Sequence, residues 1–162
     1  MTMDRLWAPW RIKYVKSKKN KKCIFCEGIK NKRKNYVIFK TGSSFAMLNI
    51  FPYNNGHAMV SPIRHKPELS QLKDEEALDL FHTLNKVKGL LDRVLKPHGY
   101  NIGINLSKSA GAGIAGHLHI HIVPRWQGDT NFMPALYDTK IVSQSLDELY
   151  KKLSEAQTYG TK

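Results

Sequence analysis

Three histidines at alternating positions, His117, His119 and His121, are the residues of this chain best suited to chemistry. Leu118 and Ile120 separate them, and this alternation predicts a β-strand that begins at His117. The three imidazoles would then lie on one face of the strand and the aliphatic side chains on the other. A neutral imidazole is both a nucleophile and a metal ligand near neutral pH. The spacing alone therefore leaves a metal site and a nucleophilic site as equal alternatives.

Glycines precede this strand and a proline follows it. Gly111, Gly113 and Gly116 predict a tight turn into the strand, and Pro124 predicts a kink after it. The glycine spacing matches the dinucleotide-binding fingerprint G-x-G-x-x-G, but that fingerprint opens a helix. Because a strand is expected here instead, a Rossmann-type nucleotide site is excluded.

Two cysteines form a second candidate for chemistry. Cys23 and Cys26 are the only cysteines of the chain, and their C-x-x-C spacing allows a redox pair, half of a zinc site, or two ordinary thiols. A structural disulfide is not expected if the protein is cytoplasmic, because thiols stay reduced there. The pair alone does not choose among these alternatives.

The length of 162 residues suits one domain with a sizeable core. We expect a basic arm over 1–22, the domain over 23–142, and a C-terminal helix and tail over 143–162. No apolar run reaches the length of a membrane span, and residues 1–10 lack the apolar region of a signal peptide. A cytoplasmic protein without a membrane partner is therefore expected.

The net charge of +13 is concentrated near the start of the chain. The first forty residues hold thirteen Lys or Arg and only two acidic residues, Asp4 and Glu27. Such a segment attracts polyanions such as RNA or nucleotide phosphates, although a lysine-rich surface also simply keeps a protein in solution. We favour the second explanation, because no base-stacking motif accompanies the charge. A non-enzymatic RNA-binding protein remains an outside alternative, and nucleic acid is not expected as a specific partner.

The hydrophobic pattern predicts an α+β fold with an antiparallel sheet. In addition to the histidine strand, strands are expected at 36–39, 45–50, 57–61 and 101–106. Most of them are joined by turns of hairpin length, and one long helix is inserted between the third and fourth. This arrangement favours antiparallel pairing over the parallel pairing of α/β folds.

Two helices follow from periodicity and capping signals. A long amphipathic helix is expected from an N-cap at Asp74 to a stop at Pro97. A second is expected after the capping box that begins at Ser145, with fraying beyond Glu155. The residues expected to face inward are Ala77, Leu80, Phe81, Leu84, Val87, Leu91, Val94 and Leu95 in the first helix, and Leu146, Leu149, Tyr150 and Leu153 in the second.

The segment HLHIHIVPR at 117–125, together with Asn49, Gly56-His57 and the Ala110-Gly111 loop, resembles the histidine-triad (HIT) family of nucleotide hydrolases and transferases. The resemblance covers about residues 23–126. Within the family, the chain is most similar to bacterial diadenosine tetraphosphate phosphorylases. The segments that support this subgroup are 6–11, 101–105, 110–115, 124–126 and 131–134.

The resemblance implies a five-stranded antiparallel sheet with one long and one or two short helices, and a homodimer that joins two sheets into one of ten strands. It implies nucleotidyl transfer, with His119 as the nucleophile that forms a nucleotidyl-histidine intermediate and His121 as the residue that contacts the phosphate or leaving oxygen. In this subgroup inorganic phosphate attacks the intermediate, so diadenosine tetraphosphate yields ADP and ATP. Attack by water, on dinucleoside polyphosphates or on nucleoside phosphoramidates, is the alternative.

The family pattern also implies which residues contact the substrate. Asn49 matches a ribose-contacting position and Asn105 a phosphate-contacting amide, while the loop that leads to the triad would hold phosphate oxygens with its N–H groups. Arg125 would favour an anionic acceptor, and Trp126 would either stack on a base or pack against the protein. Leu48, Ile50 and Phe51 would wall the base pocket. The expected substrate-contacting residues are therefore Leu48, Asn49, Ile50, Phe51, Asn105, Gly113, Ile114, Ala115, Arg125 and Trp126.

A structural zinc site is implied by comparison with zinc-containing members of the family. The ligands carried over are Cys23, Cys26, His65 and His117, a closed Cys₂His₂ set. Two packed thiols and a surface histidine are the alternative. His57 is expected as a buried hydrogen-bonding residue under the triad. No catalytic metal is evident, because acidic residues are scarce near these motifs.

Overall fold

A computed structural model describes residues 22–130 and 144–158 of the protein. The basic arm, apart from residue 22, and the predicted subgroup segment 131–134 lie outside the described residues. The sheet runs in the order β1-β2-β3-β5-β4, and each pair of neighbouring strands is antiparallel. Its strands are β1 (Val37–Lys40), β2 (Ser44–Leu48), β3 (Ala58–Pro62), β4 (Gly99–Ile104) and β5 (Ile120–Arg125).

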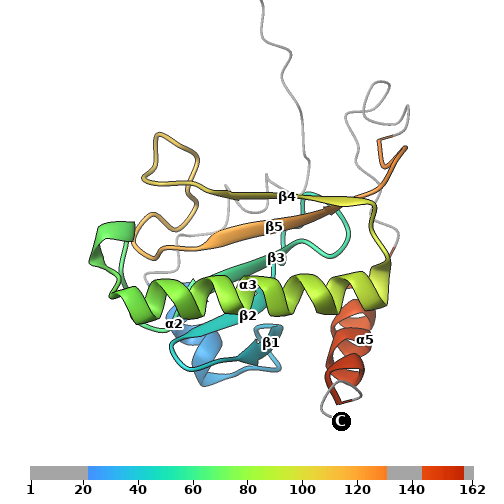
Figure 1. The fold of residues 1–162 in the computed structure, drawn as a ribbon, viewed down its shortest axis with the longest axis horizontal. Coiled ribbons are helices and arrows are strands. Elements are labelled where there is room, and N and C mark those ends of the chain that lie inside the picture. Colours follow the sequence, from blue (N-terminus) through green and yellow to red (C-terminus); the bar gives the residue numbers. More distant parts are fainter. Residues whose placement is uncertain (1–21, 131–143, 159–162) are drawn as a thin grey trace, which may run out of the picture.

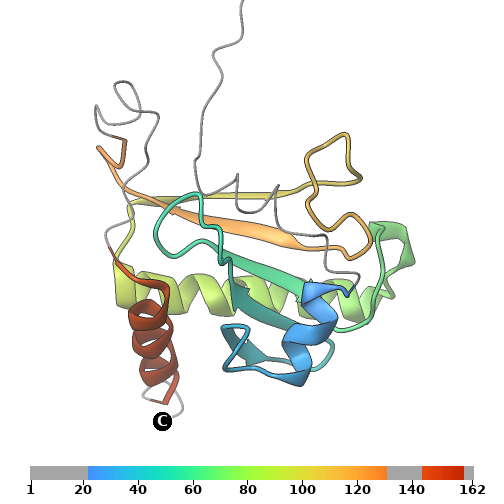
Figure 2. The ribbon, with the colours of Figure 1, turned by 180° about the vertical axis from the view of Figure 1, so that it is seen from behind.

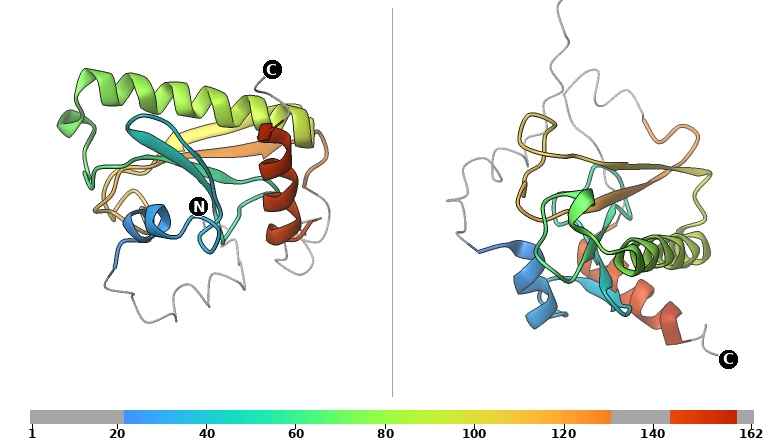
Figure 3. Two further views of the ribbon diagram at one scale, coloured as in Figure 1. Left: turned by 90° about the horizontal axis from the view of Figure 1, so that it is seen from below. Right: turned by 60° about the vertical axis from the view of Figure 1, so that its left-hand side comes forward.

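One long helix and shorter ones accompany the sheet, so the predicted α+β fold with a five-stranded antiparallel sheet is confirmed (Figure 1). Helix α3 (Asp74–Leu95) runs along one face of the sheet, and α2 (Ile24–Lys30) lies on the opposite face, as Figure 3 shows. Helix α5 (Leu146–Thr158) packs at the end of α3 (Figure 2), and η1 (Leu69–Gln71) is a single 3₁₀ turn. Among the described residues, no helix is both long and apolar enough to cross a membrane.

The sheet has a hydrophobic core on each face. The larger core lies under α3 and includes Leu149 and Leu153 of α5. The smaller core lies under α2 and consists of Phe25, Val37, Phe45, Met47 and Met59, all at most 5% exposed. Because side chains alternate along a strand, β2 sends Phe45 and Met47 to one core and Ala46 and Leu48 to the other.

The helix predictions are largely confirmed, with corrections at the boundaries and at one side chain. The N-cap of α3 is Lys73 rather than Asp74, and its backbone N–H donates to Glu76 at 2.9 Å. Phe81 was expected inward but is 59% exposed, because it lies about 100° around the helix from the buried Leu80. Leu90 is buried instead.

The second helix begins as the capping signal predicts. The N–H of Glu148 donates to Ser145 Oγ at 3.2 Å, and Leu149 and Leu153 are buried. The helix continues to Thr158, three residues beyond the point where fraying was expected.

The predicted strand over the triad begins too early. β5 starts at Ile120, so His117 and His119 precede it, and β4 ends at Ile104 rather than at residue 106. The physical reason is that the chain before Ile120 bonds elsewhere: the N–H of Leu118 donates to the Lys66 carbonyl at 2.6 Å, and Ser61 Oγ donates to the Leu118 carbonyl at 2.8 Å.

Candidate active site and metal centre

His119 is held by its own neighbour's backbone. Its Nδ1–H donates to the His117 carbonyl at 2.8 Å, since a carbonyl oxygen only accepts. The proton of the neutral ring is therefore on Nδ1, and Nε2 keeps its lone pair. The side chain is 5% exposed.

His57 and His121 form a pair whose protons are also fixed by a backbone group. The N–H of Tyr53 donates to His57 Nδ1 at 3.1 Å, so the neutral His57 ring carries its proton on Nε2. That N–H points at His121 Nδ1, 2.9 Å away. The Nδ1 of His121 therefore accepts, and the neutral His121 ring carries its proton on Nε2. The two triad histidines consequently present opposite functions at Nε2: a lone pair on His119 and an N–H on His121.

Burial keeps these imidazoles neutral at physiological pH. Burial, with smaller contributions from His121 and His119, lowers the pKa of His57 to about 3. Burial, with a smaller contribution from His119, lowers the pKa of His121 to about 4. The pKa of His119 is lowered by burial as well, while its hydrogen bond to the His117 carbonyl acts in the opposite direction. Neutral rings are the form in which a histidine acts as a nucleophile or donates a neutral N–H.

Phe25 of α2 covers the inner side of the triad and was not predicted as part of the site. It is fully buried, and its ring centroid lies 5.1 Å from that of His117 and 4.7 Å from that of His119. Its position between the two cysteines was the available signal. Because Phe25 lies between Cys23 and Cys26 in the sequence, its ring packs close to the place where the two cysteines meet His117.

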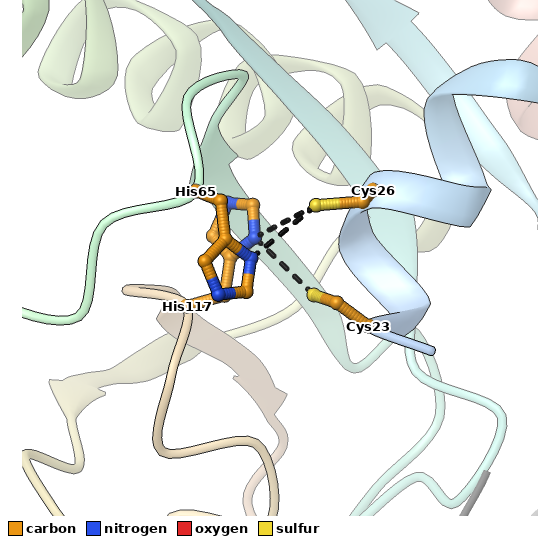
Figure 4. A group of neighbouring side chains, drawn as sticks. All are labelled: Cys23, Cys26, His65 and His117. Carbon is orange, nitrogen blue, oxygen red and sulfur yellow. Dashed lines mark hydrogen bonds between the residues drawn. The ribbon is translucent and has the colours of Figure 1, made fainter. Parts of the chain in front are cut away.

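Cys23, Cys26, His65 and His117 come together in a cluster that can hold a metal ion (Figure 4). Their ligand atoms all lie within 4.8 Å of one another. His117 Nδ1 is 3.3 Å from Cys23 Sγ and 3.6 Å from Cys26 Sγ, and His65 Nδ1 is 3.3 Å from Cys26 Sγ. The resemblance named the same four residues.

The donor set fits a tetrahedral ion. Ligand atoms bound to zinc at its usual bond lengths lie about 3.3–3.8 Å apart, close to the separations seen here. His117 Nε2–H donates to the Pro62 carbonyl at 2.8 Å, which leaves Nδ1 unprotonated and facing the sulfurs. Burial and the neighbouring Cys23 raise the pKa of Cys26, and coordination would favour the thiolate.

The two amides expected to contact the substrate, Asn49 at the ribose and Asn105 at the phosphate, have different surroundings. Asn49 is bonded within its own loop: Oδ1 accepts the Phe51 N–H at 2.9 Å, and Nδ2 is 3.3 Å from His57 Nδ1. Asn105 follows β4, one residue beyond Ile104, which pairs with Ile120 at the start of β5.

The expected base-pocket and loop residues differ in exposure. Leu48 is fully buried in the core under α3, whereas Ile50 is 51% exposed and Phe51 is half-buried. Leu48 therefore packs the core in this structure and offers little surface to a base. In the turn before the triad, Gly113 is exposed and Ile114 and Ala115 are half-buried.

Arg125 is paired with an acidic residue that was not predicted. Its Nε and Nη2 donate to Asp129 at 2.6 and 3.0 Å, and its Nη1 donates to Asn101 at 2.6 Å. Asp129 also accepts from Asn54 Nδ2 at 2.8 Å and from the backbone N–H of Trp126, a half-buried residue, at 3.2 Å. The pairing offsets the charge of Arg125, so its main role in this structure is to tie the exit of β5 to the loop at Asn54.

Comparisons with known proteins agree with this geometry. Residues 30–128 match the HIT domain family. An AP-4-A phosphorylase from Mycobacterium tuberculosis is 35% identical over 162 residues, which cover 94% of this chain and 83% of that protein. A bis(5'-nucleosyl)-tetraphosphatase (asymmetrical) from Schizosaccharomyces pombe is 37% identical over 93 residues, which cover 57% of this chain and 50% of that protein.

A solved structure supports the fold assignment. The crystal structure of a Zn-bound histidine triad family protein from Mycobacterium smegmatis has a TM-score of 0.68 to this chain at 24% identity, and the match covers 85% of this chain and 94% of that one. Fold and site together define an α+β protein of the histidine-triad type. The chain belongs to the HIT family.

Proposed function

We propose that the protein transfers a nucleotidyl group through a covalent intermediate on His119, and that its substrate is a dinucleoside polyphosphate. The observation that carries this proposal is the pair of opposite Nε2 functions: a lone pair on His119 and an N–H on His121. Their ring centroids are 4.9 Å apart, so both reach one substrate phosphate. The named relatives, a phosphorylase and a tetraphosphatase, support the substrate class.

In the first step His119 Nε2 attacks the α-phosphorus and an N–P bond forms. The bond from that phosphorus to the bridging oxygen breaks, and the leaving nucleotide departs with the electron pair. The Nε2–H of His121 stabilises or protonates the leaving oxygen. Asn105 and the N–H groups of residues 113–115 hold the phosphate oxygens in this scheme, and Asn49, Ile50 and Phe51 hold the nucleoside.

In the second step an acceptor oxygen attacks the nucleotidyl-histidine and releases His119. With inorganic phosphate as the acceptor, diadenosine tetraphosphate yields ATP in the first step and ADP in the second. We choose phosphorolysis because the M. tuberculosis relative, which matches nearly the whole chain, is named a phosphorylase. The S. pombe relative supports the alternative in which water attacks and AMP is released.

The test is incubation of the purified protein with diadenosine tetraphosphate and labelled inorganic phosphate, followed by separation of the nucleotides. Label in ADP, formed in equal amount to ATP, is the expected result. AMP and ATP in the presence and absence of phosphate would mean that water is the acceptor. Absence of turnover of this substrate, with release of ammonia from adenosine 5'-phosphoramidate, would favour the phosphoramidate alternative.

We propose that the Cys₂His₂ cluster binds zinc, and the Zn-bound relative supports this choice of metal. With four protein ligands, the ion would be structural rather than catalytic. The residues themselves tie α2 and the loop at His65 to the position just before β5. His117 supplies its side chain to the cluster and its carbonyl to His119 Nδ1, so the cluster positions the nucleophile.

We further propose a cytoplasmic homodimer joined through β4. This strand is at the edge of the described sheet, and an edge strand exposes backbone groups that pair readily with a second copy. Two sheets joined in this way would form one of ten strands. Light scattering on the purified protein measures the mass, and a monomer at micromolar concentration would contradict the proposal.

A further inference from the structure

A hollow lies on the same face of the sheet as His121. It has a volume of about 230 Å³ and is lined by Tyr53, Asn54, Asn101, Val123 and Arg125. The face is defined by the strand register, because Gly103 pairs with His121 and Asn101 pairs with Val123. Paired residues of antiparallel strands point to the same side, so the hollow continues the active-site face along β5.

The hollow begins next to the catalytic histidines. Val123 and Arg125 follow His121 by two and four residues, which corresponds to about 7 and 13 Å along the strand. The way between them is open: a Cβ placed on Gly103, opposite His121, would meet no atom within 4 Å. Tyr53 joins the two regions, since its ring centroid is 6.2 Å from that of His121.

The direction of the reaction leads toward this hollow. In phosphoryl-group chemistry the attacking and leaving atoms are roughly in line through phosphorus. An attack from His119 Nε2 therefore sends the leaving oxygen to the far side, where the N–H of His121 is available. The remainder of a dinucleoside polyphosphate, which leaves as a nucleotide, extends from that oxygen past His121.

The lining suits a nucleobase better than a further phosphate. Tyr53 presents a ring that is 43% exposed and is stacked on His57 with centroids 4.8 Å apart and planes at 22°, so it offers a fixed aromatic face. Val123 is aliphatic, and the amide of Asn101, whose Oδ1 accepts from Arg125, supplies a polar group. The Nδ2 group of Asn54 is bonded to the Pro124 carbonyl and to Asp129. The positive charge of Arg125 is offset by its two bonds to Asp129. A hollow smaller than the about 300–1,000 Å³ of drug-sized sites fits a base rather than a whole nucleotide.

We propose that this hollow binds the base of the leaving nucleoside, and that Tyr53 and Asn101 determine the preference for substrates with a second nucleoside. This inference rests on the proposed function, because it assigns the distal half of the same substrate. It separates dinucleoside polyphosphates from substrates whose leaving group is a bare polyphosphate or an amine.

The experiment compares two substrates that differ only in the distal nucleoside: diadenosine tetraphosphate and adenosine 5'-tetraphosphate. The ratio of their kcat/KM values measures what the second nucleoside contributes. We expect a ratio of about ten or more in the native protein. Asn101→Trp fills the hollow and should bring the ratio close to one. Ile102→Trp makes the same change at the next residue, on the other face of β4, and should keep the ratio within twofold of the native value.

A second pair of variants tests the aromatic wall without filling the hollow. Tyr53→Leu should lower the ratio about threefold or more, whereas Tyr53→Phe should preserve it, because stacking needs the ring and not the hydroxyl. Thermal midpoints identify variants that fail to fold. If Asn101→Trp fails to fold, the comparison of Tyr53→Leu with Tyr53→Phe provides the test. Equal kcat/KM values for both substrates in the native protein, or parallel losses in Asn101→Trp, would overturn the subsite. Failure of the native protein to cleave either substrate would overturn the proposed function instead.

Discussion

The protein has histidines in two adjoining regions, and the Nδ1 atoms have different partners in the two regions. In the cluster of Cys23, Cys26, His65 and His117, both histidines direct Nδ1 toward a sulfur. In the region of His57, His119 and His121, Nδ1 of each ring is occupied by an internal hydrogen bond.

The triad histidines therefore differ in function although they are identical in type and regular in spacing. His117 donates Nε2–H to the Pro62 carbonyl, which frees Nδ1 for a metal. His119 donates Nδ1–H to the His117 carbonyl, which frees Nε2 for a substrate. In each of these rings, the hydrogen-bond partner of one nitrogen therefore selects the role of the other nitrogen.

The largest effect is expected from removing the nucleophile. His119→Ala should lower turnover of diadenosine tetraphosphate by roughly 10⁴-fold or more, because no other described group presents an equivalent lone pair to the substrate. Mass spectrometry of the intact protein after a short incubation measures the nucleotidyl adduct. His82→Ala, an exposed histidine on α3, is the matched control and should keep native turnover. An adduct that persists in His119→Ala would contradict the assignment of the nucleophile.

Replacing His121, the hydrogen-bond donor next to the nucleophile, should lower turnover less than replacing His119. His121→Gln keeps a hydrogen-bonding amide but removes the imidazole N–H, so kcat for diadenosine tetraphosphate should fall about 100-fold. The adduct should still form, more slowly, in rapid-quench measurements. A fall as large as that of His119→Ala, with no adduct, would mean that the two histidines do not have separate roles.

Removing one ligand from the cluster of Cys23, Cys26, His65 and His117 should weaken metal binding and lower stability. Cys23→Ser should lower zinc affinity about tenfold or more and reduce the thermal midpoint, because one ligand is replaced by a weaker one. Elemental analysis gives the stoichiometry, and calorimetry gives the midpoint. A folded native protein that contains no metal after purification with zinc present would contradict the zinc proposal, whatever its activity.

The smallest effect is expected in the pH dependence of stability. The pKa values of His57 and His121 are lowered to about 3 and about 4 from an unfolded value near 6.5. Between these values the unfolded chain binds protons that the folded protein does not, so the free energy of unfolding falls as the pH falls. We expect each of the two histidines to contribute a loss of about 2 kcal/mol between pH 7 and pH 5 in urea titrations. His57→Gln should reduce this slope, and an unchanged slope would contradict the buried neutral pair.

Parts of the site could be predicted from the sequence because their signals are local. The C-x-x-C spacing and the alternating histidines are visible in single segments, and the family pattern added His65 to them. Phe25 and Asp129 were missed, since Phe25 occupies an unspecified position of the C-x-x-C spacing and Asp129 belongs to no motif. Phe25 matters because α2 lies over the triad, and Asp129 because it receives bonds from both Arg125 and Asn54. Such contacts depend on how distant segments pack.

The sequence by itself determined the strand and helix periods and the candidate ligands, because these follow from side-chain type and spacing along one segment. Only the tertiary structure decided where the histidine strand begins and which nitrogen of each ring carries the proton. Both depend on partners far away in the chain: Ser61 and Lys66 bond the backbone of Leu118, and the N–H of Tyr53 fixes His57 and, through it, His121. A hydrogen bond needs its donor and acceptor in place, and folding alone brings them there.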